Sequence, residues 1–312
     1  MIKKWNKIIK YLKNPMAAFV KLGSMGFFNW MSDEIYLKIA YWTLIGKKLN
    51  LKNPKTFNEK LQWLKLHDRK TIYNTMVDKY EVKKYVADII GSQYVIPMLG
   101  VWDKFDDIDF KKLPSQFVLK CTHDSGGVVV CSDISKFDYK AARKKINKSL
   151  NHNYYWKGRE WPYKDLKPRI IAEKYIEDTE IHELYDYKFF CFHGVPHLCY
   201  IVTDRHFGND EIKCDFFDMD FNHLPLTNSY PNTQKTIKCP QSFEEMKKLA
   251  AILSVNIPHI RVDFYEINGK IFFGELTLTS SSGFLRFSPV EWDKKIGDLL
   301  HLSPNSVQPT SR

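Results

Sequence analysis

The sequence feature that most constrains the fold is an Asn-Gly pair between two strand-like runs near the C-terminus. Residues 260–265 read IRVDFY and residues 270–276 read KIFFGEL, with Asn268-Gly269 between them. An Asn-Gly pair in this setting is a strong signal for a two-residue β-hairpin turn. We therefore predict an antiparallel hairpin in which these two runs pair.

The predicted hairpin carries charged side chains among apolar ones. Alternation places Arg261 and Asp263 on one face of the first strand, and Glu275 and Thr277 on one face of the second. Two carboxylates that meet across a sheet repel each other unless a cation lies between them. Oxygen ligands beside nucleotide phosphates suit Mg²⁺. Asp263 and Glu275 are therefore candidate metal ligands, and a solvated sheet face is the alternative interpretation.

The rest of the chain mixes helical and strand-like segments without regular β-α-β alternation. Residues 1 to about 90 have helical periodicity, and short β-rich runs begin at Tyr94–Pro97. A helix is expected at Asp138 to Leu150, and a second hairpin over residues 187–202 with its turn at Gly194–Pro196. This interleaving predicts an α+β fold with antiparallel sheets.

Two Ser-x-x-Glu patterns in the C-terminal third predict helix starts with capping boxes. One joins Ser242 to Glu245, and the other joins Ser288 to Glu291 with a proline at the first helical position. The second of these helices is expected to end near His301.

Composition and charge limit the class of protein. Hydrophobic residues make up 44% of the 312 residues and charged residues 27%, which excludes a disordered chain. The six cysteines include no C-x-x-C pair, so a reduced, cytoplasmic protein is expected. No apolar run approaches the ~18 residues of a membrane span. The net charge of +11 favours polyanionic partners, but no signature of nucleic-acid binding is present.

The N-terminus is basic and amphipathic. Six lysines precede the first acidic residue, Asp33, and apolar residues recur at helical spacing from Ile2 to Met16. A basic helix that contains a tryptophan such as Trp5 can lie in a membrane interface, and the alternative is a helix docked on its own domain. We expect a helix within residues 1–30 and a peripheral membrane contact through residues 1–22 at the inner face of the membrane.

A predicted strand that carries a lysine near its end leads into a glycine-bearing turn at residues 117–128. The stretch reads FVLKCTHDSGGV, with Lys120 followed by Ser125–Gly127. The N–H groups of such a turn can bind phosphates while the lysine supplies a positive charge, and an ordinary hairpin turn is the alternative. An acidic loop, EKYIEDTE, begins at Glu173 and can offer backbone groups to a purine edge.

In their order along the chain, the lysine-and-glycine turn, the acidic loop and the C-terminal hairpin resemble the ATP-grasp superfamily. Residues from about 30 to 285 resemble the TupA-like ATP-grasp family. The stretches that carry the resemblance are LNLKNPKTFNEK from Leu49, DKYEV from Asp78, LPSQFVLK from Leu113, DYKFFCF from Asp186 and FGELT from Phe273. The resemblance implies an ATP-grasp fold, in which two α+β subdomains grip ATP and Mg²⁺ bridges its phosphates.

The resemblance also implies a domain organisation. The expected units are the N-terminal helix at 1–30, a helical region at 31–92, an ATP-grasp domain at 93–302 and a disordered tail at 303–312. Within the ATP-grasp domain, a lid subdomain is expected at about 115–172 and a C-terminal subdomain at about 173–302.

Each residue that matches the family pattern inherits an expected role. The nucleotide phosphates would be contacted by Lys79, Lys120 and Lys188, under a lid formed by Ser125, Gly126 and Gly127. Adenine would be held by Glu173, Tyr175 and Ile176, and the ribose by Glu180. The Mg²⁺ ligands would be Asp263, Glu275 and Thr277, and the catalytic residues Arg261 and Lys188. Two positions depart from the pattern: Thr277 replaces a common Asn, and Asp124 adds a negative charge beside the expected phosphates.

The function implied by the resemblance is an ATP-dependent carboxylate–amine ligase of capsule or cell-wall polysaccharide biosynthesis. It would form an amide on a hexuronic acid of an acidic cell-surface polysaccharide through an acyl phosphate. Its partners would be an acidic saccharide and an amine such as an amino acid. Arg205 and Arg286 are candidate contacts for the substrate carboxylate, because guanidinium groups bind carboxylates in a bidentate manner.

Two other patterns suggest different functions. Asp218-Met219-Asp220 is a D-x-D, with which a glycosyltransferase of polysaccharide biosynthesis would hold a metal on a nucleotide sugar; a simple turn is the other interpretation. Cys191, His193, His197 and Cys199 alternate across the predicted hairpin, but their spacing matches no familiar zinc site.

Overall fold

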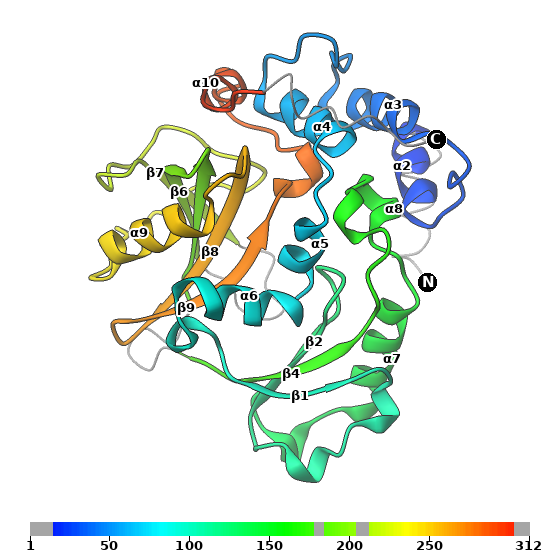
Figure 1. Cartoon of the computed structure of the whole chain (residues 1–312), viewed down its shortest axis with the longest axis vertical. Coiled ribbons are helices and arrows are strands. Elements are labelled where there is room, and N and C mark those ends of the chain that lie inside the picture. Colours follow the sequence, from blue (N-terminus) through cyan, green and yellow to red (C-terminus); the bar gives the residue numbers. More distant parts are fainter. Residues whose placement is uncertain (1–14, 178–183, 204–211, 303–312) are drawn as a thin grey trace.

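A computed structural model describes residues 15–177, 184–203 and 212–302 of the chain (Figure 1). It confirms the α+β fold, because two sheets are present and all strand pairs within them are antiparallel. The described helices are α2 (Pro15–Ser24), α3 (Asp33–Ile45), α4 (Phe57–His67), α5 (Ile72–Val77), α6 (Glu81–Ile90), α7 (Tyr139–Leu150), α8 (Tyr155–Gly158), α9 (Phe243–Leu253) and α10 (Glu291–Leu299). The strands are β1 (Met98–Trp102), β2 (Phe117–Cys121), β3 (Val128–Cys131), β4 (Ile170–Lys174), β5 (Asp186–Phe192), β6 (Val195–Thr203), β7 (Lys213–Phe217), β8 (His259–Ile267) and β9 (Lys270–Thr277).

The smaller sheet has the strand order β1-β4-β2-β3, and the larger has the order β7-β6-β5-β8-β9. Helix α7 packs on the smaller sheet, and the sheet begins with β1, before the expected lid boundary at residue 115. Helices α9, α6 and α5 cover one face of the larger sheet, while α4 and α10 cover part of the opposite face. The two sheets lie on either side of α6 in Figure 1.

Strand β5 carries both charged and apolar side chains on one face of the larger sheet. All seven of its residues are buried, and successive side chains point to opposite faces. Phe189 belongs to the core beneath α9, whereas Phe190 and Phe192 belong to the core beneath α4 and α10. Asp186 and Lys188 share the face of Phe190, which places two charged residues beside the apolar core that α4 and α10 cover.

Both predicted hairpins are confirmed. In β8–β9, Asn268 and Gly269 have φ angles of 50° and 73°, the left-handed pair that a two-residue hairpin turn requires. In β5–β6 the turn is His193-Gly194, one residue earlier than expected. The strand expected at Tyr94–Pro97 is wrong, because Ser92–Tyr94 forms a short 3₁₀ helix and β1 begins at Met98.

Both capping boxes are wrong, although both helices exist. The Ser242 hydroxyl donates to the Glu266 carboxylate at 3.0 Å and makes no cap hydrogen bond to α9. Ser288 exchanges backbone hydrogen bonds with Thr227, at 2.9 and 2.8 Å, so the chain there is extended and α10 begins only at Glu291. In both cases a residue distant in the sequence forms the hydrogen bonds that the capping box would have formed within the helix.

The N-terminal prediction is only partly covered. The described part of the expected helix, α2, is docked on its own domain, where Phe19 stacks on Phe28 with ring centroids 4.5 Å apart. Residues 1–14 and the tail at 303–312 lie outside the described residues. Among the helices that are described, none combines the length and apolar character needed to span a membrane.

Candidate active site

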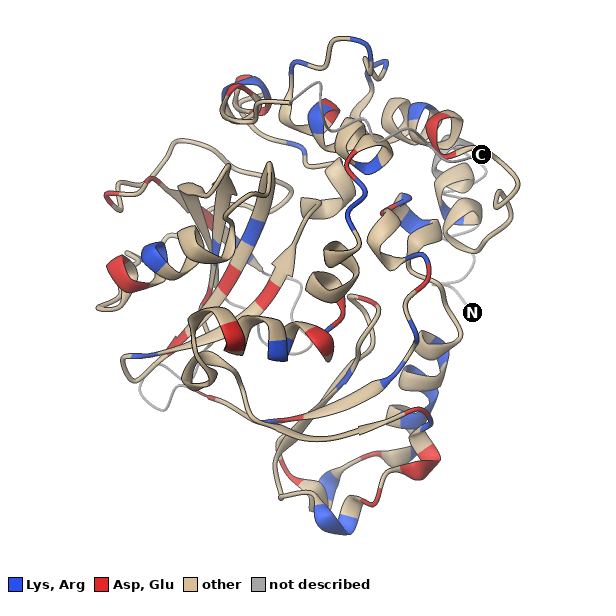
Figure 2. Ribbon diagram, viewed as in Figure 1, with Lys and Arg blue, Asp and Glu red and all other residues tan. Residues whose placement is uncertain are grey.

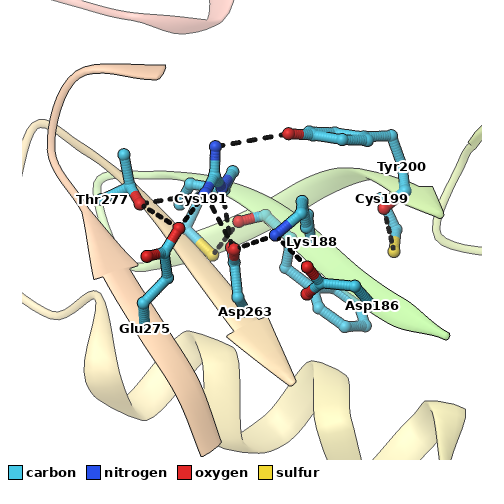
Figure 3. A network of polar contacts seen from close by, with 10 residues as sticks. Asp186, Lys188, Cys191, Cys199, Tyr200, Asp263, Glu275 and Thr277 are labelled. Carbon is cyan, nitrogen blue, oxygen red and sulfur yellow. Dashed lines mark hydrogen bonds and ion pairs between the residues drawn. The ribbon is translucent and has the colours of Figure 1, made fainter. Parts of the chain in front are cut away.

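A row of polar side chains crosses the larger sheet (Figure 3). The register pairs Tyr200 of β6 with Lys188 of β5, Lys188 with Asp263 of β8, and Asp263 with Glu275 of β9. Directly opposed residues in a ladder lie on the same face. The two carboxylates predicted to meet across the hairpin are therefore neighbours on the face that also carries Lys188.

Arg261 connects the members of this row. Its Nε and Nη2 donate to the two carboxylate oxygens of Asp263 at 2.7 and 2.8 Å. The same Nη2 donates to Glu275 Oε1 at 2.5 Å and to Thr277 Oγ1 at 3.0 Å, and Nη1 reaches the Tyr200 hydroxyl at 3.3 Å. A guanidinium held by this many partners is fixed in position before any substrate arrives.

Lys188 is the second cation of the row. Its Nζ lies 2.5 Å from Asp186 Oδ2 and also contacts Asp263 Oδ2. Burial alone would lower the pKa of Lys188, but the two carboxylates outweigh burial and raise it above its usual value. Sequence reasoning missed Asp186, although its position two residues before Lys188 on one strand places both on the same face.

The two central carboxylates differ in exposure. The Asp263 side chain is 1% exposed and that of Glu275 is 43% exposed. Burial raises the pKa of Asp263 to about 6 despite the nearby Arg261 and Lys188. For Glu275, burial also acts upward, but Arg261 and Lys188 prevail and lower its pKa to about 2. Glu275 is thus an ionised and accessible carboxylate at neutral pH.

The donor set fits Mg²⁺. Asp186, Asp263 and Glu275 oppose Arg261 and Lys188, so full ionisation leaves one excess negative charge, and Thr277 adds a hydroxyl oxygen beside Glu275 at 3.2 Å. In the part of the chain that the structure describes, no three His, Cys, Asp or Glu side chains gather as a metal site. Mg²⁺ is commonly held by one or two carboxylates plus substrate phosphates, so Asp263 and Glu275 remain candidate ligands, with both Asp263 oxygens bound by Arg261 and Lys188 in this structure.

A second charged group lies on the smaller sheet. Glu173 of β4 contacts Lys120 of β2 at 2.5 Å and Lys83 of α6 at 2.6 Å. Burial would raise the pKa of Glu173, but the two lysines outweigh it and lower the pKa to about 2. The carboxylate is committed to these lysines, and Glu173 lies in an inner strand that pairs with both β1 and β2. The expected adenine residues Tyr175 and Ile176 follow this strand and are half-buried. Lys83 was not predicted, and Glu180 lies outside the described residues.

The glycine-bearing turn between β2 and β3 is held by Asp124 and Lys79. The buried Asp124 carboxylate accepts hydrogen bonds from the Gly127 N–H at 3.0 Å and from the Ser149 hydroxyl, while Lys79 Nζ donates to the Asp124 carbonyl. Asp124 therefore shapes the turn from inside, and its carboxylate is occupied rather than directed at phosphates. Ser125 and Gly126 are exposed.

Electrostatic effects link the surroundings of the turn to the polar row. The Ser125 hydroxyl donates to the Tyr154 hydroxyl at 3.0 Å. The charge of Glu275 contributes to raising the pKa of Tyr154, after the larger effect of burial, and Lys79 helps to lower that of Glu275 after Arg261 and Lys188. Charged residues of both signs mark β8, β9, β4 and α6, where the sheets approach each other (Figure 2).

The remaining predicted residues that the structure describes lie outside the polar row and the glycine-bearing turn. Asp218 accepts hydrogen bonds from the N–H groups of Asp220 and Asn222 at 3.0 and 2.8 Å, so the D-x-D forms a turn. Arg286 is exposed and donates through Nε to the Leu44 carbonyl at 2.7 Å. Cys191 and Cys199 lie in the apolar core beneath α9, and Arg205 lies outside the described residues.

Two antiparallel sheets with helices, a lysine-and-glycine turn on the smaller sheet and a carboxylate pair on the larger one are features of ATP-grasp proteins. The sequence model described as TupA-like ATPgrasp matches residues 59–301. The chain therefore belongs to the TupA-like ATP-grasp family, and its fold and family are those of ATP-grasp ligases. No curated protein matches the chain significantly.

Solved structures with a similar fold are distant. D-alanine–D-alanine ligase from Bacillus anthracis, complexed with ATP, is 14% identical with a TM-score of 0.37, over 65% of this chain and 54% of that one. The Helicobacter pylori enzyme is 14% identical with a TM-score of 0.42, over 79% and 68%. The ATP-grasp ligase PsnB, complexed with minimal precursor, Mg and ADP, is 9% identical with a TM-score of 0.38, over 71% and 57%. The chain spans about half the length of the first of these, and such values transfer neither residues nor substrates.

Proposed function

We propose that the protein is an ATP-dependent carboxylate–amine ligase that modifies an acidic cell-surface polysaccharide or its precursor. The observation that carries the proposal is Arg261, fixed between Asp263 and Glu275 in the register of β8 and β9, in a member of the TupA-like ATP-grasp family. This places a guanidinium beside an oxygen donor set suited to Mg²⁺ and nucleotide phosphates.

The reaction has two steps. A carboxylate oxygen of the substrate attacks the γ-phosphorus of ATP, the bond to the β–γ bridging oxygen breaks, and ADP leaves with an acyl phosphate formed. An amine nitrogen then attacks the acyl carbon, and the C–O bond to phosphate breaks. Inorganic phosphate departs, the nitrogen loses a proton, and an amide is formed. The carboxylate is assigned to a hexuronic acid and the amine to a compound such as an amino acid.

The residues of the site supply fixed charge for both steps. Lys188 is held as a cation by Asp186 and Asp263, and Lys120 is held by Glu173, so both are positioned to neutralise phosphate oxygens. Mg²⁺ bound by Asp263 and Glu275 would supply further neutralisation of the phosphates. Arg261 is held by three side chains of β8 and β9 and would stabilise the acyl phosphate.

The nucleotide contacts complete the proposal. Lys79 and the turn at Ser125, Gly126 and Gly127 would close over the phosphates, because Ser125 and Gly126 are exposed and the turn is anchored on Lys79 through Asp124. Glu173, Tyr175 and Ile176 would hold adenine, and Glu180 would take the ribose. Thr277 would orient Glu275, because its hydroxyl donates a hydrogen bond to Glu275 Oε1.

The test is ADP release from the full chain with hexuronic acids crossed against amines, followed by product mass. ADP formation that needs both substrates, with a product equal to their sum minus water, supports the ligase. Glu275→Gln should abolish this activity, whereas Asp218→Asn should retain it. Consumption of a UDP-sugar without ATP, lost in Asp218→Asn but kept in Glu275→Gln, would establish the glycosyltransferase instead.

A further inference from the structure

An exposed apolar surface lies on α2, α3 and the turn between them. We call it the N-terminal apolar surface, and it consists of Leu22, Met25, Phe27, Trp30, Ile35 and Trp42. Trp30 is 79% exposed, Phe27 61% and Trp42 55%. Large aromatic side chains that cluster in solvent mark an interaction site more often than single exposed residues do.

The exposed apolar residues of α3 lie on one face of the helix. Ile35 and Trp42 are seven residues apart, so they lie on the same face of the helix two turns from each other. The opposite face of α3, with Tyr36 and Tyr41 among its residues, is buried in the domain. Helix α3 thus buries one apolar face and leaves a second one exposed.

The turn is rigidly supported from inside the protein. Arg159, whose side chain is 1% exposed, donates to the Phe28 carbonyl at 2.7 Å and to Asp33 Oδ1 at 3.4 Å. Phe28 points inward onto Phe19, while its neighbour Phe27 remains exposed. A buried arginine that fixes both ends of the turn holds its aromatic side chains on the outside of the molecule.

The N-terminal part of the sequence, which includes this surface, is basic. Residues 1–48 contain nine lysines and two acidic residues, so +7 of the formal +11 lies in the first 48 residues. Lys21, Lys38, Lys47 and Lys48 are exposed within the described part. Over residues 15–48 the four lysines outnumber the two acidic residues, and an anionic surface would attract them.

We propose that the N-terminal apolar surface docks on an anionic lipid bilayer, with Trp30, Phe27 and Trp42 in the interface and the surrounding lysines over the headgroups. Tryptophan is favoured at the boundary between headgroups and acyl chains, and lysines near an anionic membrane add electrostatic attraction. This inference goes beyond the proposed reaction and does not depend on it. It places the contact on residues 21–48, adjoining the basic N-terminal segment.

The experiment is co-sedimentation of the full chain with vesicles of phosphatidylcholine and phosphatidylglycerol in equal parts. The wild type should bind, should be released by added salt, and should bind poorly to pure phosphatidylcholine. Phe27→Ser with Trp30→Ser should weaken binding at least about tenfold, because two aromatic side chains lose their burial. The matched control is Val195→Ser with Val255→Ser, which removes exposed apolar side chains elsewhere and should bind like the wild type.

A charge variant keeps the test informative should the aromatic variant unfold. Lys47→Glu with Lys48→Glu changes only exposed side chains beyond the end of α3 and should also reduce binding about tenfold. Equal binding to neutral vesicles, binding that survives both variants, or no binding by the wild type overturns the proposal. A shift from dimer to monomer in Phe27→Ser with Trp30→Ser, measured by analytical ultracentrifugation, would assign the surface to a second copy and overturn it as well.

Discussion

Replacing Glu173 by Gln should destabilise the protein in a pH-dependent way. The Glu173 carboxylate is almost fully buried and neutralises Lys120 and Lys83 at 2.5 and 2.6 Å. Glutamine keeps the size of the side chain but removes the charge, which leaves the two lysines without their shared counterion. Breaking a buried ion pair from one side is strongly destabilising, because the remaining charge stays buried.

The pKa of Glu173 sets the magnitude. It falls from an ordinary 4.5 to about 2 in the folded protein, and each unit is worth ~1.4 kcal/mol. The ionised carboxylate therefore contributes about 3 kcal/mol to the free energy of unfolding at neutral pH. Because the folded pKa is depressed, this contribution is fully present above the unfolded pKa and is lost as pH falls towards the folded pKa. At pH 3 only about 1.5 kcal/mol of it remains.

The assay is urea unfolding followed by the fluorescence of the eight tryptophans, at pH 7 and at pH 3. Glu173→Gln should cost about 3 kcal/mol at pH 7 and roughly half of that at pH 3. The matched control is Glu81→Gln at the start of α6, whose side chain is 47% exposed in a pair with Arg169 and should cost under about 1 kcal/mol. A cost for Glu173→Gln that is the same at both pH values would refute the reasoning.

Three further predictions concern the site. Glu275→Gln should abolish Mg²⁺-dependent ADP release while changing the free energy of unfolding by under about 1 kcal/mol. Asp263→Asn should abolish ADP release as well and should not lower the free energy of unfolding at pH 7, because the folded protein raises the pKa of Asp263 and so disfavours its ionised form; a loss above ~2 kcal/mol in urea unfolding would contradict this. Gly127→Ala should cost ~1–3 kcal/mol, since its Cβ would lie 2.4 Å from Ser149 Oγ, while Gly126→Ala, with no atom nearer than 3.8 Å, should unfold like the wild type. Lys120→Ala should raise the dissociation constant of a fluorescent ATP analogue at least tenfold, and an unchanged constant would remove this lysine from the nucleotide site.

The sequence was sufficient for the hairpin that carries the site. Asn268-Gly269 specifies the turn and the pairs next to it, from Ile267 with Lys270 to Phe264 with Phe273. A β-bulge between Asp263 and Phe264 then shifts the register by one residue and opposes Asp263 to Glu275, and the turn alone does not predict this shift. Strand alternation from these two residues identifies Arg261 and Thr277, which are opposed two pairs further along. Signals of this kind succeed because turn geometry and strand alternation are fixed by residues close together in the chain.

Partners that come from distant segments were beyond that logic. Lys83 lies on α6 and meets Glu173 of β4, ninety positions away in the chain, and no local pattern pairs them. Asp124 was expected to place its charge beside the phosphates, yet Ser149 and Gly127 occupy its carboxylate. The destination of a polar side chain depends on which tertiary group reaches it, and that is decided only when the sheets and helices have packed.

The two capping boxes and the polar row show which sequence signals predict a hydrogen-bond partner reliably. Ser242 and Ser288 have local helix partners within reach, but Glu266 and Thr227 take their hydrogen-bonding groups after folding. In the polar row, by contrast, Lys188 lies in a fully buried strand, and its charge is neutralised by Asp186 of the same strand and by Asp263 of the neighbouring strand. A charged residue inside an apolar strand therefore predicts a tertiary site more securely than a polar residue in a loop predicts a cap, because burial without a partner costs several kcal/mol, whereas a lost cap costs only ~1 kcal/mol.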